Sequence, residues 1–241
     1  MKKDTLFREN SDKQDFLFND QVADVFDDML TRSVPCYAQV IDITSKIISK
    51  LVRPGDTIYD LGCSTGTTLL ELSRRLSEPE VTFIGIDTSA AMLNRATHKA
   101  EMYSQGNRIQ FIEQDITKAD FTEAGVILLN YTLQFIRPPR RQDFMNRIAR
   151  SLRPGGVLIV SEKVISHSPR LNPLFIDAHL DFKRKNGYSE TEISRKRESL
   201  ENVLIPFSIQ ENHQMMAQAG LTDVDTFFQW FNFASIMAIK G

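Results

Sequence analysis

Short apolar runs alternate with amphipathic segments along most of the chain. Over residues 20–51 apolar side chains recur at helical intervals and Pro35 interrupts them, which predicts two helices. From residue 57 onward, runs rich in Val, Ile and Leu alternate with stretches of helical period, which predicts a parallel sheet covered by helices on both faces. The expected strands span residues 57–62, 81–87, 108–115, 125–135 and 157–163, and the expected helices span residues 65–77, 89–104 and 139–156.

The pattern changes after Glu162. Two polar-rich helices are predicted at residues 174–187 and 189–204, as a helical insertion over about 170–203. Residues 223–241 alternate between polar and apolar, which predicts a closing hairpin with one antiparallel strand. The whole chain, residues 1–241, is therefore expected to form a single α/β domain with this insertion.

Composition narrows the class of protein. The 241 residues are 41% hydrophobic and 25% charged, which fits one globular domain. With 29 basic and 31 acidic residues the net charge is -2, so a surface built mainly for nucleic-acid phosphates is not expected. The N-terminus is charged and the sequence has no long apolar run, so we expect the protein to be neither exported nor inserted into a membrane. Cys36 and Cys63 are too few for a disulfide framework and lack a His cluster, which indicates a cytoplasmic protein without a metal site.

The first predicted strand leads into a loop of small residues. Gly62, Ser64 and Gly66 stand at alternate positions, and Asp60 precedes the first glycine by two residues. This is neither the GxGxxG of dinucleotide sites nor the GxxxxGK[ST] of P-loops. A carboxylate here would repel phosphate and suits a ligand with positive charge. The alternative is that the glycines serve only the backbone geometry of a strand-to-helix turn.

Polar residues also end the next three predicted strands. Asp87 stands where a carboxylate can accept both hydroxyls of a ribose, although it could instead cap the following helix, unless Ser89 does so. Asp115 and Ile116 stand where an adenine could be hydrogen-bonded and packed, and Asn130 adds a neutral donor and acceptor. Because the carboxyl ends of parallel strands share one edge, these side chains predict a nucleoside site.

These motifs resemble those of the class I S-adenosylmethionine-dependent methyltransferase fold, over roughly residues 55–241. That resemblance implies a Rossmann-like, mostly parallel seven-stranded sheet with an antiparallel terminal strand. Ser64 departs from the glycine usual at its position. Over nearly the whole chain, the segments RSVPCY, YDLGCS, LNYTLQF, SEK, FKRKNGYSE, KRESLENV and WFNFASIMAIK resemble the bacterial carboxy-S-adenosyl-L-methionine synthases.

The closer resemblance implies an unusual reaction. S-adenosylmethionine and prephenate give carboxy-S-adenosylmethionine and phenylpyruvate. Prephenate loses carbon dioxide and hydroxide as it aromatises; the hydroxide takes a proton from the methyl group that the sulfonium acidifies, and the deprotonated carbon captures the carbon dioxide. The product is the donor for carboxymethylation of the wobble uridine in tRNA, although such enzymes do not bind tRNA as a substrate. The resemblance also implies a homodimer, and an enzyme that mainly holds two ligands together and excludes water.

The resemblance also assigns roles to residues. Arg197, in KRESLENV, is implied to bind the new carboxylate, and no acid or base is assigned. Without the resemblance, Arg197 would be interpreted as part of a solvated helix face. Whether Arg197 acts on the site of its own subunit or on that of a dimer partner stays open. The implied set for S-adenosylmethionine and its carboxylated product is Tyr37, Asp60, Gly62, Cys63, Ser64, Asp87, Thr88, Asp115, Ile116, Asn130 and Arg197.

Two other function classes stay open at this point. A conventional small-molecule methyltransferase would share every cofactor residue and differ in the use of Arg197 and the insertion. A non-catalytic nucleotide-binding or tRNA-interacting protein is disfavoured by the pI near 6.1. Cys63 is expected to fill space rather than act as a nucleophile. The scattered histidines are expected to be surface or packing residues, and among them only His179, near the inserted helices, could line a prephenate pocket.

Overall fold

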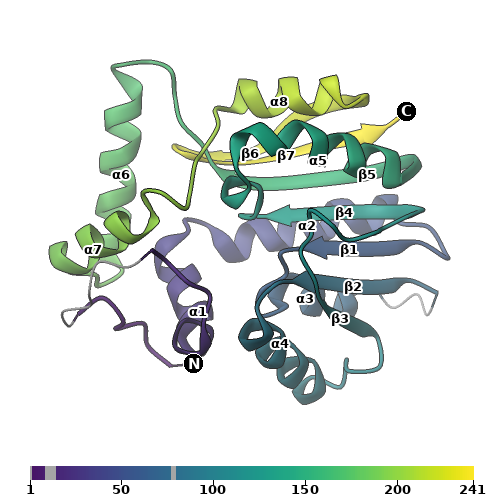
Figure 1. Cartoon of the computed structure of the whole chain (residues 1–241), viewed down its shortest axis with the longest axis horizontal. Coiled ribbons are helices and arrows are strands. Elements are labelled where there is room, and N and C mark those ends of the chain that lie inside the picture. Colours follow the sequence, from purple (N-terminus) through teal and green to yellow (C-terminus); the bar gives the residue numbers. More distant parts are fainter. Residues whose placement is uncertain (1, 9–14, 77–79) are drawn as a thin grey trace.

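The computed structural model describes residues 2–8, 15–76 and 80–241, and within them seven strands form one sheet. The strand order is β3-β2-β1-β4-β5-β7-β6, so the chain fills the sheet outward in two directions from the junction of β1 and β4 (Figure 1). The strands are β1 (Thr57–Leu61), β2 (Thr82–Asp87), β3 (Ile109–Glu113), β4 (Ala124–Asn130), β5 (Leu152–Lys163), β6 (Leu221–Trp230) and β7 (Phe233–Lys240).

Strand direction follows the sequence pattern. The five strands from β3 to β5 pair in parallel, whereas β7 pairs antiparallel with both β5 and β6. The predicted mostly parallel sheet with an antiparallel terminal hairpin is therefore confirmed. All five parallel strands point their carboxyl ends toward one edge, and the predicted nucleoside residues lie at that edge.

The described residues form eight α-helices and one short 3₁₀ helix around this sheet. The helices are α1 (Asp20–Ser33), α2 (Tyr37–Leu51), α3 (Thr67–Arg75), α4 (Ala90–Met102), η1 (Leu133–Phe135), α5 (Pro138–Ser151), α6 (Leu171–Lys185), α7 (Glu190–Leu200) and α8 (Ile209–Gln218). Residue 77 of the predicted helix 65–77, and residues 1, 9 and 10 of the charged N-terminus, lie outside the described residues.

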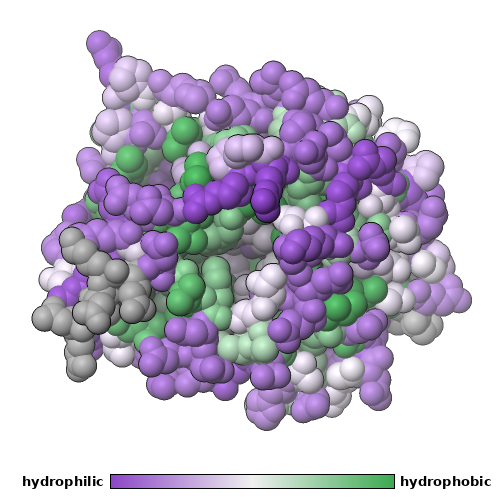
Figure 2. Space-filling view, in the orientation of Figure 1, coloured by the Kyte–Doolittle hydropathy of each residue, from purple (hydrophilic) through white to green (hydrophobic). Residues whose placement is uncertain are grey.

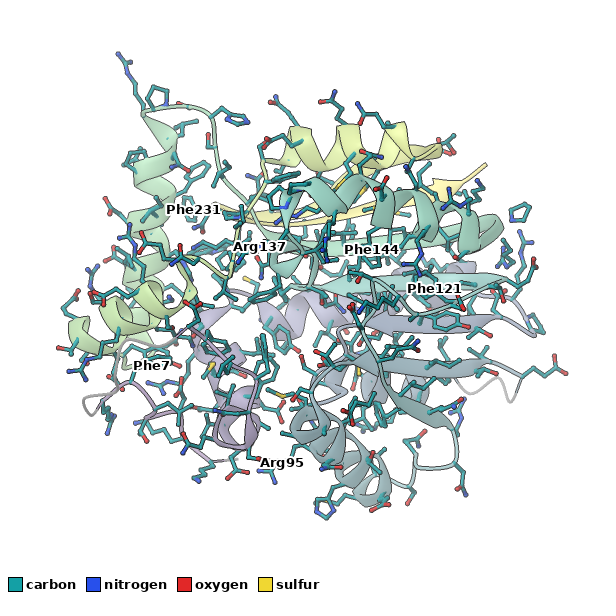
Figure 3. The ribbon with its side chains drawn as sticks, viewed as in Figure 1. Phe7, Arg95, Phe121, Arg137, Phe144 and Phe231 are labelled. Atoms are coloured by element: carbon teal, nitrogen blue, oxygen red, sulfur yellow. The ribbon has the colours of Figure 1, made fainter. Side chains whose placement is uncertain are left out.

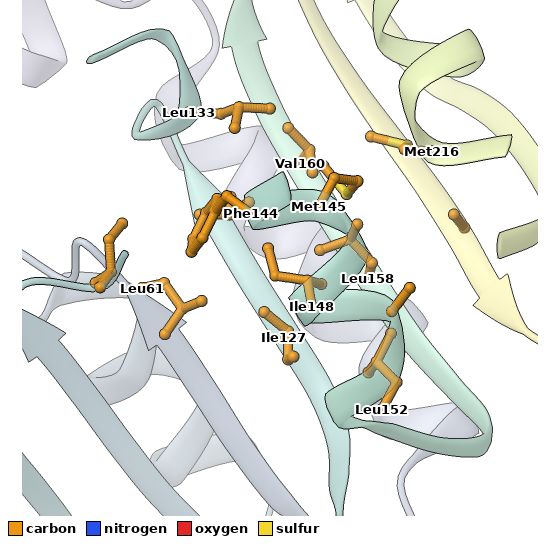
Figure 4. Packing of buried hydrophobic residues seen from close by; sticks show 14 of the residues in the cluster. Leu61, Ile127, Leu133, Phe144, Met145, Ile148, Leu152, Leu158, Val160 and Met216 are labelled. Atoms are coloured by element: carbon orange, nitrogen blue, oxygen red, sulfur yellow. The ribbon is translucent and has the colours of Figure 1, made fainter. Parts of the chain in front are cut away.

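The two faces of the sheet bury separate apolar layers. Along β4, Ile127 and Leu129 face the layer formed with α5 and α8, whereas Val126 and Leu128 face the layer formed with α2, α3 and α4. In the first layer, the apolar face of α5 packs on β4 and β5 (Figure 4). Burial on both faces explains why the central strands are almost continuously apolar in sequence.

Three details differ from the sequence-based expectation. Asn130 ends the fourth strand, as expected, but the run 125–135 does not continue as a strand beyond it, because Tyr131 adopts a positive φ of 59° and η1 follows. The helix expected to reach residue 156 ends at Ser151, and β5 begins at Leu152. Helix α8 was not predicted, although the spacing of Ser208 and Glu211 is that of a capping box, which the structure contains.

The N-terminal segment packs against the inserted helices. Phe16 N–H donates to Ser199 O at 3.0 Å, and Arg8 pairs with Glu192 at 3.1 Å. Asp4 is 1% exposed and accepts a hydrogen bond from the Tyr188 hydroxyl. Helices α6 and α7 consequently lie beside α1, at the end of the sheet where the parallel strands terminate (Figure 1).

Candidate functional site

A cavity of about 440 Å³ lies at the carboxyl ends of the parallel strands. Helices α1, α6 and α7 border it opposite the sheet, and Figure 2 shows a hollow with hydrophobic walls in this region. Its lining includes Tyr37, Asp60, Gly62, Cys63, Ser64, Asp87, Thr88, Asp115, Ile116 and Asn130. The structure thus brings together every predicted S-adenosylmethionine residue except Arg197, which is exposed on α7 and is not among the described residues that line the cavity.

The loop after β1 is a sharp turn built on left-handed backbone. Gly62, Ser64 and Gly66 have φ values of 79°, 48° and 71°. A Cβ on Gly62 would lie 2.4 Å from Thr132 Cγ2, so glycine is required there for space as well as for conformation. Ser64 occupies a conformation that glycine favours, which accounts for the glycine expected at its position.

Asp87 connects this loop to the start of α4. One carboxylate oxygen accepts from Ser64 N–H at 2.9 Å and the other accepts from Ser89 N–H at 2.9 Å. Ser89 itself caps α4, because its hydroxyl accepts from Met92 N–H. Asp87 is therefore not the helix cap, and the remaining lone pairs of its carboxylate are available to hydroxyl donors in the cavity.

Asp60 is a buried acid at the end of β1. Its side chain is 2% exposed, and its Oδ1 atom has no hydrogen-bond partner among the described residues. Burial, with a smaller contribution from the nearby charge of Asp87, raises its pKa to about 7. An orphaned, buried carboxyl oxygen facing a cavity fits a cationic ligand, because the cation would offset the loss of hydration.

The adenine end predicted at β3 has a preformed turn. Asp115 Oδ1 accepts from the backbone N–H and the hydroxyl of Thr117, at 2.9 and 2.7 Å, and the hydroxyl bond is the main reason that the pKa of Asp115 is lowered. Ile116, 9% exposed, lines the cavity beside it. An ionised acceptor and an apolar surface are what an adenine amino group and ring face require.

The middle of the cavity is polar on the sheet side and aromatic above it. Asn130 Nδ2 donates to Thr68 Oγ1 at 3.2 Å. Tyr37 lies with its ring centroid 6.2 Å from that of Tyr131, and burial followed by the charges of Asp27 and Asp60 raises the pKa of its phenol. Both hydroxyls of these tyrosines therefore stay protonated and can donate hydrogen bonds.

Cys63 has the environment of a space-filling residue. Burial, together with the negative charges of Asp60 and Asp87, raises the pKa of its thiol well above the ordinary value. A thiol that stays protonated is poorly suited to nucleophilic attack.

An ion pair that the sequence did not predict fixes the loop after β1. Lys99 of α4 pairs with Asp27 of α1 at 2.9 Å, and its ammonium also donates to the hydroxyls of Thr65 and Thr67. Asp27 in turn accepts from Thr65 at 2.7 Å. Helices α1 and α4 and the start of α3 thus hold the loop through the Lys99 ammonium and the Asp27 carboxylate. Because these elements are far apart in sequence, no local motif indicates the contact.

A second buried group supports the loop after β4. Glu162 is 3% exposed, and its two oxygens accept from the backbone N–H groups of Leu133 and Gln134 at 2.7 and 3.2 Å. Arg141, 2% exposed, donates to the carbonyls of Gln134 and Ile136. Arg141 lies in the charged run RPPRRQD, which is typical of a solvated helix surface, and only the tertiary fold reveals its burial.

The cavity wall far from β1 carries basic side chains that sequence analysis did not select. Lys163, Lys183 and Lys196 line it together with His179, the histidine expected near a second substrate. Arg137, labelled in Figure 3, also lines the cavity, and its guanidinium donates to Asn202 O at 2.8 Å.

Within residues 2–8, 15–76 and 80–241, no three His, Cys, Asp or Glu side chains are grouped so that they could hold a metal ion. In the same part of the chain, no helix has both the length and the apolar character needed to cross a membrane.

Comparison with known proteins identifies relatives over the full length. A carboxy-S-adenosyl-L-methionine synthase of Desulfotalea psychrophila is 53% identical over 99% of this chain and 98% of its own. Synthases of the same name from Wolinella succinogenes and Vibrio cholerae are 47% and 44% identical over 99% of this chain, and 99% and 97% of theirs. The methyltransferase domain family matches residues 58–156.

Solved methyltransferase structures share the fold of this chain. A putative O-methyltransferase from Nostoc punctiforme has a TM-score of 0.66 and 17% identity, covering 92% of this chain and 59% of that one. The magnesium protoporphyrin IX methyltransferase of Synechocystis, with bound SAH, has a TM-score of 0.62 and 15% identity, covering 88% and 87%. The predicted Rossmann-like class I methyltransferase fold is thereby confirmed. Given this fold, the cavity at its strand ends and the full-length relatives, the chain belongs to the carboxy-S-adenosyl-L-methionine synthase family.

Proposed function

We propose that the protein synthesises carboxy-S-adenosyl-L-methionine from S-adenosylmethionine and prephenate, with release of phenylpyruvate. The observation that carries this proposal is 53% identity to a synthase of that name over nearly the whole of both chains. A match confined to the strand-end motifs would fit any methyltransferase, whereas this match also includes the inserted helices α6 and α7.

The strand-end residues fit S-adenosylmethionine. Asp60 offers its orphaned oxygen to the positive charges of the methionine portion, and the Asp87 carboxylate accepts the ribose hydroxyls. Asp115 and Ile116 receive the adenine, and the loop from Gly62 to Gly66 encloses the amino-acid end. When bound, this substrate supplies a methyl group that the neighbouring sulfonium makes acidic.

The remaining residues position the second substrate and exclude water. Aromatic rings lie along the cavity from the tyrosine pair to Phe233, whose ring centroid is 6.2 Å from that of Tyr131. Tyr37 and Tyr131 hold neutral donors above the strand ends. As prephenate aromatises it releases carbon dioxide and hydroxide, the hydroxide takes the methyl proton and leaves as water, and the resulting carbanion adds to the carbon dioxide. A largely apolar cavity keeps these species next to the methyl carbon, so catalysis rests on proximity rather than on a protein base.

The test is product analysis. The protein is incubated with S-adenosylmethionine, with and without prephenate, and the small molecules are analysed by mass spectrometry. We expect S-adenosylmethionine to gain one carboxyl group only when prephenate is present, with an equal amount of phenylpyruvate. If protein that binds S-adenosylmethionine forms no carboxylated product, and methylates a small molecule instead, the proposal is wrong.

Arg197 is proposed to bind the new carboxylate, because its planar guanidinium can donate two parallel hydrogen bonds. It is exposed on α7 and directly follows Lys196, which lines the cavity, and its charge contributes to lowering the pKa values of Lys163 and Lys183. It can serve its own site or that of a second subunit. If Arg197→Ala leaves the affinity for carboxy-S-adenosylmethionine unchanged in calorimetry, this role is excluded.

We further propose a homodimer that works in the cytoplasm and supplies the donor for carboxymethylation of tRNA wobble uridine, without binding the tRNA itself. Leu171 and Leu174 on α6 and Phe231 at the hairpin between β6 and β7 are 46%, 60% and 45% exposed, which supports an apolar contact between subunits (Figure 3). Light scattering at micromolar concentration tests the dimer, and a monomeric mass would exclude it.

A further inference from the structure

Two buried lysines and one half-buried lysine line the side of the cavity that is formed by α6, α7 and the end of β5. Lys183 of α6 and Lys196 of α7 are 9% and 6% exposed, and Lys163 ends β5. The ammonium of Lys196 donates to Ser33 Oγ at 3.0 Å and lies 3.8 Å from Asp4 Oδ2. The ammonium groups of Lys163 and Lys183 have neither a hydrogen bond nor an ion pair to any described residue.

The charges around these lysines are predominantly positive. Burial, followed by the charges of Lys196, Lys163 and Arg197, lowers the pKa of Lys183 to about 7. Burial lowers the pKa of Lys196 to about 8, although Asp4 and Asp28 oppose the effect and Arg32 adds to it.

His179 adds no balancing charge to this cluster. Burial and the three lysines lower its pKa to about 3, so it is neutral, and its Nε2–H donates to Ser33 O at 2.9 Å. The two carboxylates that influence the cluster, Asp4 and Asp28, act on Lys196 and leave the other two ammonium groups unbalanced.

Unbalanced buried ammonium groups are unfavourable for folding, so their presence on a cavity wall calls for an anionic ligand. A single carboxylate would balance one of them, whereas two carboxylates match Lys163 and Lys183 together. The apolar surface beside them is aromatic: Phe233 pairs with Lys163 across the sheet and lies 4.8 Å from the His179 ring. The ligand chemistry that fits is therefore a dicarboxylate with an unsaturated ring.

We propose that Lys163 and Lys183, supported by Lys196, bind the two carboxylates of the second substrate and select for a ring-bearing dicarboxylate. This inference rests on the proposed function for the existence of a second substrate in the same cavity. It assigns the substrates to opposite ends, with S-adenosylmethionine on the strand-end acids and the dianion on the lysines.

The test compares Lys183→Met with Lys185→Met, a matched control on the same helix whose side chain is exposed. For Lys183→Met we expect the KM for prephenate to rise about 10- to 100-fold, because one hydrogen bond between a charged donor and the substrate is lost. The Kd for S-adenosylmethionine should stay within about twofold, and the melting temperature should not fall, because a buried unpaired charge has been removed. Lys183→Arg should recover part of the prephenate affinity, and Lys185→Met should behave as wild type.

Proton uptake provides a second measurement. Prephenate is titrated calorimetrically into protein saturated with S-adenosylhomocysteine, near pH 7.5 and in buffers of different ionisation heat. Wild type should take up protons on binding, because two carboxylates raise the pKa of Lys183 from about 7, and Lys183→Met should take up fewer. Lys163→Met, measured in the same way, should also bind prephenate more weakly.

The outcomes separate this inference from the proposed function. If Lys183→Met and Lys163→Met form product with a wild-type KM for prephenate, the lysine site is wrong and the proposed function stands. If either variant loses S-adenosylmethionine affinity as strongly as prephenate affinity, the lysines serve the first substrate and the inference is also wrong. If wild type binds prephenate without forming product, and the variants lose that binding, the site stands and the proposed function fails.

Discussion

At the residue scale, Asp60 links the charge of the ligand to pH. Its folded-state pKa of about 7 lies above the ordinary value of 3.8 because the carboxyl is buried. Without a ligand, ionisation of Asp60 therefore disfavours the folded state, and its contribution to stability declines as the pH rises from about 4 to about 7. A bound cation favours the ionised form and reverses that effect.

This predicts a pH dependence for S-adenosylmethionine binding. We expect the affinity to fall about tenfold as the pH is lowered from 8 to 6, because protons compete with the ligand for Asp60. Calorimetric Kd values across this range give the measurement. Asp60→Asn should bind weakly with little pH dependence, and the exposed Asp120→Asn should match wild type. An unchanged pH profile in Asp60→Asn would assign the titration to another group, such as Asp87, whose pKa burial also raises.

Gly62 permits a second prediction, because Gly55 provides a matched control. Both have positive φ, 79° and 85°, but a Cβ on Gly55 meets no atom within 4 Å, whereas one on Gly62 meets Thr132 at 2.4 Å. We expect Gly62→Ala to reduce the free energy of unfolding by about 1–3 kcal/mol more than Gly55→Ala does, and to weaken S-adenosylmethionine binding. Denaturant titration measures the difference. Equal losses in the two variants would mean that the contact with Thr132 is relieved without consequence.

At the scale of elements, the helices and strands follow from local sequence far better than their supporting contacts do. Apolar runs predicted the five parallel strands, because burial on both faces excludes polar residues. The burial of Arg141 and Lys183 could not be predicted, since each occurs in a charged helical stretch that is typical of a solvated surface. Which side of such a helix is covered depends on the neighbouring elements, and those neighbours are distant in sequence.

The ion pair between α1 and α4 provides a prediction about elements. Lys99 and Asp27 are 18% and 31% exposed, and they hold the loop after β1 in place. We expect Lys99→Met to lower the free energy of unfolding by about 1–3 kcal/mol, because Asp27 loses its cation. Lys46→Met, which breaks an exposed pair with Asp42, should change it by less than about 0.5 kcal/mol. Equal effects in chemical denaturation would show that the pair between α1 and α4 adds no more than a surface pair.

At the scale of the whole molecule, segments from both ends of the chain form one cavity. Phe16 near the N-terminus and Phe233 on β7 both line it, with β1, β2 and β4 between them. The strand-end positions of the site were predictable, because parallel strands place their carboxyl ends together. The part contributed by the N-terminal segment was not, because it carries no motif and takes its position from contacts with α7.

A ligand that contacts so many segments should stabilise the whole fold. At an S-adenosylmethionine concentration of 100 times Kd we expect the free energy of unfolding to increase by about 2.7 kcal/mol. For a chain of this size, that increase corresponds to a rise in melting temperature of about 5–10 °C. Differential scanning fluorimetry over a ligand titration measures it. Asp87→Ala should lose most of the shift, since it removes the carboxylate between the loop and α4. A full shift in that variant would place the nucleoside elsewhere.

The lowered pKa of Lys183 has a consequence for chemical modification. An ordinary lysine is almost entirely protonated at neutral pH, whereas an amine with a pKa near 7 is about half unprotonated and therefore nucleophilic. A small activated ester or aldehyde that enters the cavity should acylate or condense with Lys183 in preference to the exposed lysines. The same side chain is then an anchor for covalent inhibitors, and its protection by a bound dicarboxylate would report occupancy of the cavity directly.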